Sequence, residues 1–433
     1  MNTTTRRSFV KGGALAAASL ATAMSSKRVH GASERIRVGF IGVGGRAGSL
    51  LRGFQANEDV QLVALCDVYK KTLDKRVSEA GGAVDAHEDF RRLLDRKDID
   101  AVVIVTPDHW HALQTILACQ AGKDVYVEKP LTRTIREGRM MVEVTRKHNR
   151  VVQTGTQHRS RKDLGEIQAL IQDGTIGKVT VIRAYRKSNM TPTGIGKAPD
   201  SDPPPGFNWD LWLGPAPYRP YRATIAPYKF RWWKDYSSQL GNWGVHHFDI
   251  VRILLDELAP VSVSAHGGNF AVDDDRTIPD TLEVTYEFAS GRILTFGQYE
   301  ACGNAALPRG GTELRGTLGT LALSWDGYEV IPESGGQMQE WEPRIKPIVS
   351  KDSSGDDTQL HIRNFLDCVK SREKPIGDVE EGHRSTTLSH LGNIAYEMKT
   401  RIEWDAKAER ITNSEEANRL LHYDYREPWK SVA

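Results

Sequence analysis

The residues from Gly42 to Ala47 read G-V-G-G-R-A, a pattern that could bring the backbone against a phosphate. They follow an apolar run typical of a strand and precede a stretch typical of a helix. In the pattern G-x-G-x-x-G/A, the first glycine permits a tight turn, the second lets the backbone approach a pyrophosphate, and the small last residue lets the helix pack on the strand. The N–H groups at the helix N-terminus then face the phosphates. The segment therefore predicts dinucleotide binding through Gly42, Gly44, Gly45, Arg46 and Ala47.

Asp67 ends the next apolar run, about 20 residues after the glycines. At this place a carboxylate accepts a hydrogen bond from the ribose 2′-OH of NAD and repels the 2′-phosphate of NADP. The sequence therefore favours NAD as the cofactor. NADP stays open, because Lys70 and Lys71 lie close enough to soften the repulsion.

The elements that must position these residues alternate between strand and helix. Continuous apolar strands alternating with helices indicate a parallel sheet that is covered on both faces. We expect a Rossmann domain over residues 34–158. Its predicted strands are 36–42, 60–68, 101–107, 124–130 and 151–157, and its predicted helices are about 47–57, 69–80, 88–96, 109–121 and 134–148.

The rest of the chain, residues 159–433, predicts an α+β domain with a large, mostly antiparallel open sheet. We expect this sheet to have an apolar face that needs cover, and therefore a homodimer or homotetramer. Residues 187–240 form a long segment rich in proline and aromatic residues, and loops of this length are usually functional. The predicted strands are 179–186, 261–268, 281–289, 292–300 and 312–323, and the predicted helices are 163–173, 246–255, 359–372 and 380–399.

The aromatic side chains of the long segment allow two interpretations. Their faces could stack on a sugar and form a carbohydrate platform. For most of them, packing of the segment against the sheet is the better expectation. They are Trp209, Trp212, Tyr218, Tyr221, Tyr228, Trp232 and Trp233.

Composition excludes several classes of function. Of the 433 residues, 39% are hydrophobic and 26% are charged, and the formal net charge is +2. These values indicate a soluble globular protein without a polyanionic partner, and no basic stripe suggests nucleic acid. The cysteines and histidines lack the spacing of metal ligands, so we expect no catalytic metal.

The first 33 residues resemble a twin-arginine export signal. Arg6 and Arg7 stand together, and an apolar stretch of small residues, 12–24, follows them. This stretch is too short and too rich in alanine for a stable membrane anchor. We expect an exported, periplasmic protein, and a general secretory signal is the alternative.

Two further segments, VVIVTPDHWHA at 102–112 and GKDVYVEKPL at 122–131, resemble the Gfo/Idh/MocA oxidoreductases. That family has a Rossmann domain followed by an α+β domain with a large open sheet. Its members oxidise or reduce sugars, polyols and related compounds with NAD(P). The resemblance implies a group of residues around the nicotinamide, its ribose and the substrate: Thr106, Pro107, His111, Glu128, Lys129, Gln157 and Arg159.

The family signature D-x-x-x-H-x-x-D reads Asn242 to Asp249 in this chain. The resemblance places the catalytic histidine at His246 and substrate contacts at Asn242, Asp249 and Arg159. Asn242 replaces the first aspartate, and an amide forms hydrogen bonds but takes up no proton. Asp249 could orient His246 or pair with Arg252.

Removal of hydride from a carbinol carbon needs an acceptor for the hydroxyl proton and a donor for the developing oxyanion. Lys129 suits the donor and proton relay, and its pKa should fall near the positive nicotinamide. His246 suits a general base near neutral pH. Because adjacent helical residues point about 100° apart, we expect His246 rather than His247 to face the cleft.

These inferences predict an NAD(P)-dependent oxidoreductase that acts on a sugar, polyol or glycoside and holds its cofactor tightly. The first alternative is a redox-neutral glycoside hydrolase, which oxidises its substrate, eliminates the aglycone, adds water and reduces the product. The second alternative, suggested only by Asn242, is a sugar-binding protein without catalysis.

Overall fold

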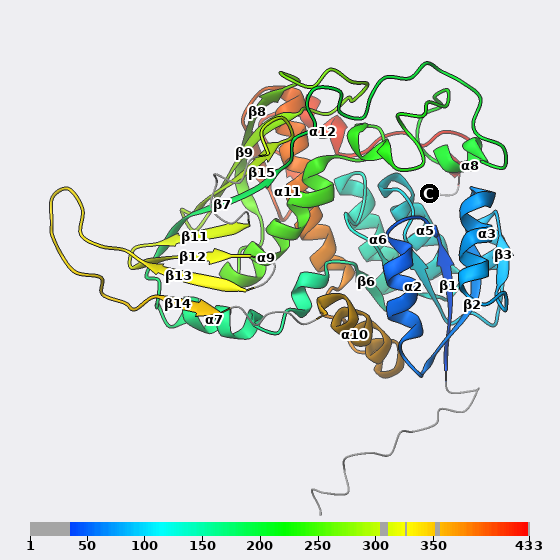
Figure 1. Cartoon of the computed structure of the whole chain (residues 1–433), viewed down its shortest axis with the longest axis horizontal. Helices are drawn as coiled ribbons and strands as arrows, with labels where there is room; N and C mark the ends of the chain where they lie inside the picture. Colours follow the sequence, from blue (N-terminus) through cyan, green and yellow to red (C-terminus); the bar gives the residue numbers. More distant parts are fainter. Residues whose placement is uncertain (1–34, 304–310, 325–326, 351–355, 432–433) are drawn as a thin grey trace, which may run out of the picture.

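The computed structural model describes residues 35–303, 311–324, 327–350 and 356–431, and the predicted export signal lies outside them. Within this part of the chain the strands form two sheets, which lie side by side in Figure 1. No helix of the same residues is long and apolar enough to cross a membrane.

The first sheet is parallel, with the strand order β3-β2-β1-β4-β5-β6. Every residue of β4 and β5 is buried, and both strands are apolar except for Asp124 at the start of β5. This confirms the predicted Rossmann fold. Its elements are β1 Ile36–Ile41, α2 Ala47–Gln55, β2 Val60–Cys66, α3 Lys70–Glu79, β3 Asp85–His87, α4 Phe90–Leu94, β4 Ala101–Ile104, α5 Asp108–Gln120, β5 Asp124–Val127, α6 Ile135–Lys147 and β6 Val152–Thr154.

The second sheet has the order β14-β13-β12-β11-β7-β10-β9-β8-β15-β16 among the described residues, and only the β7–β10 pair is parallel. The expected large, mostly antiparallel sheet is therefore confirmed. Its strands are β7 Val179–Lys187, β8 Pro260–Gly268, β9 Thr281–Phe288, β10 Ile293–Tyr299, β11 Thr312–Gly316, β12 Gly319–Leu323, β13 Tyr328–Pro332, β14 Ile348–Ser350, β15 Ile402–Asp405 and β16 Arg410–Ile411.

The prediction of one strand over 312–323 is wrong, because the chain reverses within it and forms the antiparallel pair β11 and β12. Gly316 and Gly319 flank the reversal, and both lie against backbone. A Cβ atom at Gly316 would lie 2.0 Å from the carbonyl oxygen of Ile176. The glycines therefore mark a tight turn rather than positions inside a strand.

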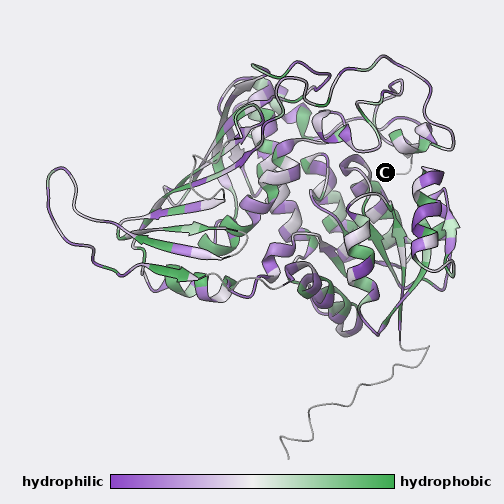
Figure 2. Ribbon diagram, in the orientation of Figure 1, coloured by the Kyte–Doolittle hydropathy of each residue, from purple (hydrophilic) through white to green (hydrophobic). Residues whose placement is uncertain are grey.

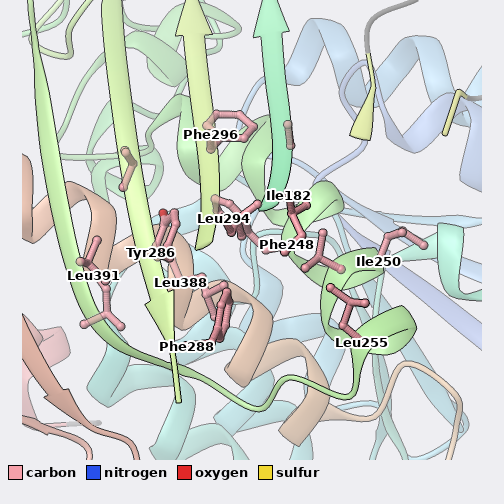
Figure 3. Close-up of a cluster of buried hydrophobic side chains, with 14 of the residues drawn as sticks. Ile182, Phe248, Ile250, Leu255, Tyr286, Phe288, Leu294, Phe296, Leu388 and Leu391 are labelled. Atoms are coloured by element: carbon pink, nitrogen blue, oxygen red, sulfur yellow. The ribbon is translucent and has the colours of Figure 1, made fainter. Parts of the chain in front are cut away.

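Helices α9, Val245–Leu255, and α11, Val379–Met398, cover one face of the second sheet. Figure 3 shows Phe248 and Leu388 of these helices directed at Tyr286 and Phe296 of the strands. The remaining helical segments are η1 Gln157–Ser160, α7 Leu164–Gln172, α8 Trp209–Leu213, η2 Lys229–Trp232, η3 Leu240–Gly244, α10 Asp357–Ser371, α12 Glu415–Asn418, η4 Arg419–Leu421 and η5 Trp429–Ser431.

The opposite face of the second sheet is mixed rather than continuously apolar. Arg183, Glu313, Thr285 and Thr295 form one row across four strands. Figure 2 shows hydrophilic residues along these strands, in purple. Apolar side chains such as Ile331, which is 48% exposed, lie among them. The expected self-association through this face stays a prediction.

The C-terminal part of the chain returns to the first sheet and fixes it against the second. Helix α10 packs on α2, and the ring of Phe365 lies 6.2 Å from Phe54 and 5.8 Å from Tyr126. Trp429 lies 4.9 Å from Trp110 of α5, between ring centroids. Residues that come after the main strands of the second sheet in the sequence therefore pack on the first domain and hold the two sheets together.

Replacement of Phe365 by alanine tests this connection. The change leaves a cavity against α2, and truncation of a buried phenylalanine costs about 3–5 kcal/mol of unfolding free energy. Urea unfolding measures the loss. Leu360→Ala on the same helix is the control, because Leu360 is 40% exposed. Equal destabilisation by the two changes would contradict the packing role of Phe365.

Candidate active site

The glycine segment forms the turn between β1 and α2. Gly42 has a φ of 80°, and a Cβ atom there would lie 2.8 Å from the amide nitrogen of Thr106 in the loop after β4. Among the described residues, and apart from each glycine and its two chain neighbours, no atom lies within 4 Å of the position of a Cβ at Gly44 or Gly45. The turn is therefore tightly packed at its first glycine and open at the next two, as a loop that accepts a pyrophosphate requires.

Asp67 is half-buried and supports this turn with hydrogen bonds. Its Oδ2 accepts a hydrogen bond from the amide of Val43 at 2.8 Å, and its Oδ1 accepts one from the amide of Tyr69 at 2.9 Å. Burial raises the pKa of Asp67 above its ordinary value, although both backbone bonds oppose the shift. The carboxylate lies at the edge of the pocket above the turn, where a ribose would lie.

A pocket with about 970 Å³ of empty volume, which includes space open to solvent, lies above the turn. One wall comes from the Rossmann domain, and the other comes from the long aromatic segment. The lining includes Gly42, Gly44, Gly45, Arg46, Asp67, Tyr69, Thr106, Pro107 and Trp110 on the first wall, and Phe207, Trp212, Tyr228, Phe230 and Arg231 on the second.

The long segment is anchored onto the Rossmann domain beside the pocket. The amide of Lys70 donates to the carbonyl of Gly206, and the amide of Asn208 donates to that of Val68, both at 2.8 Å. Most of its aromatic rings are buried, and Trp209, Trp212, Tyr221 and Trp233 belong to one cluster of the segment, against which Val68 and Tyr69 of the Rossmann domain pack. Tyr218 and Tyr228 are 73% and 59% exposed.

The buried Glu128 forms an ion pair with Arg46, which lines the pocket. Nε of Arg46 lies 2.8 Å from Oε1 of Glu128, and the Glu128 side chain is only 5% exposed. Burial would raise the pKa of Glu128, but Arg46 and Lys129 outweigh it and the pKa falls below its ordinary value. The pair joins the start of α2 to the end of β5.

Lys129 follows Glu128 and precedes a cis peptide bond to Pro130. Its Nζ donates hydrogen bonds to the backbone oxygen of Asn242 at 2.7 Å and to Oδ1 of the same residue at 3.1 Å. Burial lowers the pKa of Lys129 to about 8, although the carboxylates of Glu128 and Asp108 oppose the shift. Near neutral pH this amine can therefore both donate and accept a proton.

Asn242 lies in the π-helical turn η3, which directly precedes α9. Its Nδ2 donates to Oε1 of Gln239 at 3.2 Å, which directs Oδ1 toward the lysine. The side chain carries no charge, so it holds the ammonium without the stabilisation that a carboxylate would add. The structure thus brings together Lys129 and Asn242 from opposite domains.

His246 lies in the first turn of α9 and is 6% exposed. Burial lowers its pKa well below the ordinary value, and the charges of Lys129 and His158 lower it further. The ring is therefore neutral at pH 7. Nδ1 of His247 contacts Oγ1 of Thr312 at 2.8 Å, and burial lowers the pKa of this second histidine to about 4. The charge of Lys129 contributes to the lowered pKa of His246, whereas His158 and Arg186 contribute to that of His247.

Arg159 and Asp249, which the resemblance assigns to the substrate, bind one another. Nε and Nη2 of Arg159 lie 2.8–3.0 Å from the oxygens of Asp249, and both side chains are at least nine-tenths buried. Asp249 also accepts from Oγ of Ser385 at 2.6 Å. Arg252 donates to Ser385 and Glu381, so it is not the partner of Asp249.

His111 is buried and lies behind the pocket wall rather than on it. Its Nδ1 lies 2.7 Å from the oxygen of Pro130, and its Nε2 lies 2.8 Å from the oxygen of Thr106. The ring therefore joins the loops after β4 and β5. Thr106 and Pro107 line the pocket, and Gln157 begins η1, where it is half-buried.

Three groups of this region were absent from the sequence prediction: Asp108, His158 and Arg231. Burial raises the pKa of Asp108, and Oγ of Ser237 donates to it at 2.5 Å. Arg231 lines the pocket from the aromatic segment. A sequence signal existed only for His158, which lies directly between the predicted residues Gln157 and Arg159.

The position of Asp67 predicts the cofactor preference. In Asp67→Ala the charge that repels a 2′-phosphate is lost, so the preference for NAD over NADP should fall at least about tenfold. The two dissociation constants, measured by titration, give the ratio. Asp95→Ala, an exposed change on the end of α4, is the control. An unchanged ratio in Asp67→Ala would show that the carboxylate does not face the ribose.

Asn242→Asp tests the pKa of Lys129. A carboxylate at hydrogen-bond distance favours the ammonium, so the pKa should rise from about 8 by about 1–3 units. Because a proton acceptor must be neutral, activity that depends on Lys129 should appear only at correspondingly higher pH. The pH dependence of kcat/KM measures the shift, with Asn413→Asp as control. An unchanged pH profile would contradict the proposed role of Lys129. Turnover that appears in Asn242→Asp but is absent in the parent would indicate that the parent is a sugar-binding protein.

Comparisons with known proteins agree with the two-domain fold. Residues 36–156 match the oxidoreductase family, NAD-binding Rossmann fold, and residues 162–310 and 331–431 match the oxidoreductase family, C-terminal alpha/beta domain. The structure resembles levoglucosan dehydrogenase in complex with NADH and levoglucosan, with 17% identity, a TM-score of 0.65, and coverage of 85% of this chain and 99% of that one. It also resembles the WlbA dehydrogenase from Bordetella pertussis in complex with NADH and UDP-GlcNAcA, with 18% identity, a TM-score of 0.63, and coverage of 86% and 99%.

Sequence relatives match over shorter segments. A glycosyl hydrolase family 109 protein of Solibacter usitatus is 40% identical over 168 residues, which are 34% of this chain and 38% of the relative. The alpha-N-acetylgalactosaminidase of Shewanella oneidensis is 41% identical over 112 residues, which are 24% of each. The chain thus matches well under half the length of these relatives. The family models, by contrast, cover most of both domains, and the chain belongs to the Gfo/Idh/MocA oxidoreductase family, with an NAD-binding Rossmann domain.

Proposed function

We propose that this enzyme transfers a hydride at a carbinol carbon of a sugar, polyol or glycoside. The observation that carries the proposal is the Nζ of Lys129, held by Asn242 and next in sequence to Glu128, whose partner Arg46 lines the pocket of the glycine turn. A lysine with a pKa of about 8 has both its neutral and its protonated form populated near neutral pH. It can therefore accept the proton of a substrate hydroxyl group during oxidation and donate a proton to the oxygen during reduction.

NAD, when bound, supplies the hydride acceptor, and Gly44, Gly45 and the start of α2 would hold its pyrophosphate. The neutral amine of Lys129 accepts the proton of the substrate hydroxyl as the hydride leaves. In the reverse direction the ammonium donates to the same oxygen. The neutral ring of His246 is a second acceptor beside it.

A second candidate function is redox-neutral hydrolysis of a glycoside, in which the hydride returns to the same substrate. The specific observation that favours it is the similarity to relatives named glycosyl hydrolase family 109. The pocket supports it as well, because the aromatic segment forms its second wall and restricts the exit of a cofactor.

We include export in this proposal: residues 1–33 would direct the folded protein, with NAD inside, through the twin-arginine route to the periplasm.

The test uses the full chain, expressed with its N-terminal segment. Denaturation and mass spectrometry of the purified protein should release NAD, at a ratio approaching one nucleotide per chain. A screen of free sugars and aryl glycosides then separates the two functions. NADH that accumulates with a sugar supports net oxidation, whereas release of aglycone without NADH supports hydrolysis.

Lys129→Met is the accompanying variant, and it should retain NAD and the fold while its rate falls about 10²–10³-fold, the usual loss for a transition-state donor. Lys407→Met, an exposed change after β15, is the matched control and should keep full activity. Near-normal activity of Lys129→Met would overturn the assignment. If the protein purifies without NAD and needs added NAD at millimolar levels, the proposal that it retains its cofactor would be overturned.

A further inference from the structure

The long aromatic segment carries three arginines, and one of them differs from the other two. Arg219 pairs with Asp235 at 2.7 Å, and Arg222 pairs with Asp200. Arg231, by contrast, forms an ion pair with none of the carboxylates that the structure describes. Within this part of the chain its charge is therefore available to an anionic ligand.

Two aromatic rings hold the guanidinium of Arg231. Its Cζ lies 4.4 Å from the ring centroid of Tyr228 and 4.5 Å from that of Phe230. Nη1 of Arg231 also donates to the backbone oxygen of Tyr228 at 2.9 Å. The rings attract the cation without neutralising it. Because a guanidinium has several N–H donors and this hydrogen bond uses one of them, a fork of donors remains for a ligand.

The backbone on both sides of Arg231 is anchored. Nζ of Lys229 donates to the carbonyl oxygen of Ile195 at 2.6 Å. Nε1 of Trp232 lies 3.0–3.1 Å from the two carboxylate oxygens of Glu300, which follows β10. These contacts fix η2, which carries Arg231, to the second domain. The guanidinium therefore has a defined place in the wall of the pocket.

The pocket brings this guanidinium together with the glycine turn. Arg231 lines the same pocket as Gly44, Gly45 and Arg46, but from the second wall. The charge of Arg46 is balanced by Glu128 at 2.8 Å. Of the two arginines in the described lining, Arg231 is therefore the one whose charge no carboxylate balances.

Carboxylates near this place are engaged elsewhere. Glu300 pairs with Arg276 at 2.7 Å, and Asp108 accepts a hydrogen bond from Oγ of Ser237 at 2.5 Å. An anion that balances Arg231 would therefore have to be brought by a ligand.

The anionic part of NAD is its pyrophosphate, which the glycine turn and the start of α2 would hold. An arginine fork binds phosphate oxygens through two parallel hydrogen bonds, which are stronger than hydrogen bonds between neutral groups. We propose that Arg231 binds the pyrophosphate of NAD from the aromatic segment and slows the release of the cofactor. The inference rests on the retained-cofactor part of the proposed function and requires no hydride transfer.

Exchange of bound NAD is the first test. The purified full chain is mixed with an excess of isotope-labelled NAD, and mass spectrometry follows the loss of the original nucleotide. Arg231→Leu removes the fork and should raise the dissociation rate constant about 10–100-fold, the usual range for a lost charge-assisted hydrogen bond. Arg231→Lys keeps the charge without the fork, so its increase should be smaller.

Arg222→Leu is the matched control, because it removes the same charge from the same segment at a residue outside the lining of the pocket. Its rate constant should match that of the parent. Equal rate constants in the parent and in Arg231→Leu would overturn the proposal. An equal increase in both leucine variants would also overturn it, because packing of the segment alone would then explain the retention.

A parent that purifies without NAD would overturn the retained-cofactor part of the proposed function. The contact of Arg231 is then tested by the dissociation constants for added NAD, which should differ by the same factor between the parent and Arg231→Leu. The two failures are therefore distinguishable.

Ligand fragments identify the group that Arg231 binds. ADP-ribose contains the pyrophosphate but lacks the nicotinamide, and adenosine lacks both. In nucleotide-free protein, titration calorimetry should show that Arg231→Leu weakens the binding of ADP-ribose as much as that of NAD and leaves the binding of adenosine unchanged. Weaker binding of NAD with unchanged binding of ADP-ribose would contradict the contact with the pyrophosphate. A higher KM for the sugar with unchanged release of NAD would assign Arg231 to the substrate and overturn the proposal.

Discussion

The contact on which this site depends is the pair of hydrogen bonds from Nζ of Lys129 to Asn242. It joins the end of a Rossmann strand to the turn before α9 and so connects the two domains. Burying an ammonium is costly unless hydrogen bonds receive it. The site meets this need with two oxygens of an uncharged residue, and the lysine remains easy to deprotonate. Glu128, which could neutralise Lys129 more strongly, is shared with Arg46.

The remaining buried charges place the elements around this contact. Arg159 and Asp249 bind η1 to α9, which sets where His246 lies relative to Lys129. The packing of α10 on α2 brings Asp357 to the same region, although it lies some two hundred residues after η1 in sequence. Pairs of opposite charge thus hold the elements around the pocket, whose lining combines glycine backbone, aromatic rings and charged side chains such as Arg46, Asp67 and Arg231.

The sequence predicted the first domain well because its signals are local. Apolar strands, helices and the glycine turn each follow from short patterns, and Asp67 is placed by its position at a strand end. The second domain was less accessible: the hairpin of β11 and β12 was missed because its reversal depends on glycines that approach the backbone of Ile176. The sequence did not show which charged groups pair with one another. Arginine and aspartate are residue types suited to binding a sugar, and only the fold shows that Arg159 and Asp249 bind each other. His158 and Asp357 meet for the same reason.

The most direct test of this account is the titration of Lys129 itself in the NAD-free parent protein. The side-chain ¹³Cε signal of this residue, assigned by its absence in Lys129→Met, is followed by NMR across the pH range that includes the ordinary lysine pKa of about 10.4. The account predicts a midpoint near the pKa of about 8 that burial imposes. A midpoint at the ordinary value would show that Lys129 is solvated and not held by Asn242, and the proposed proton transfer would then have no basis.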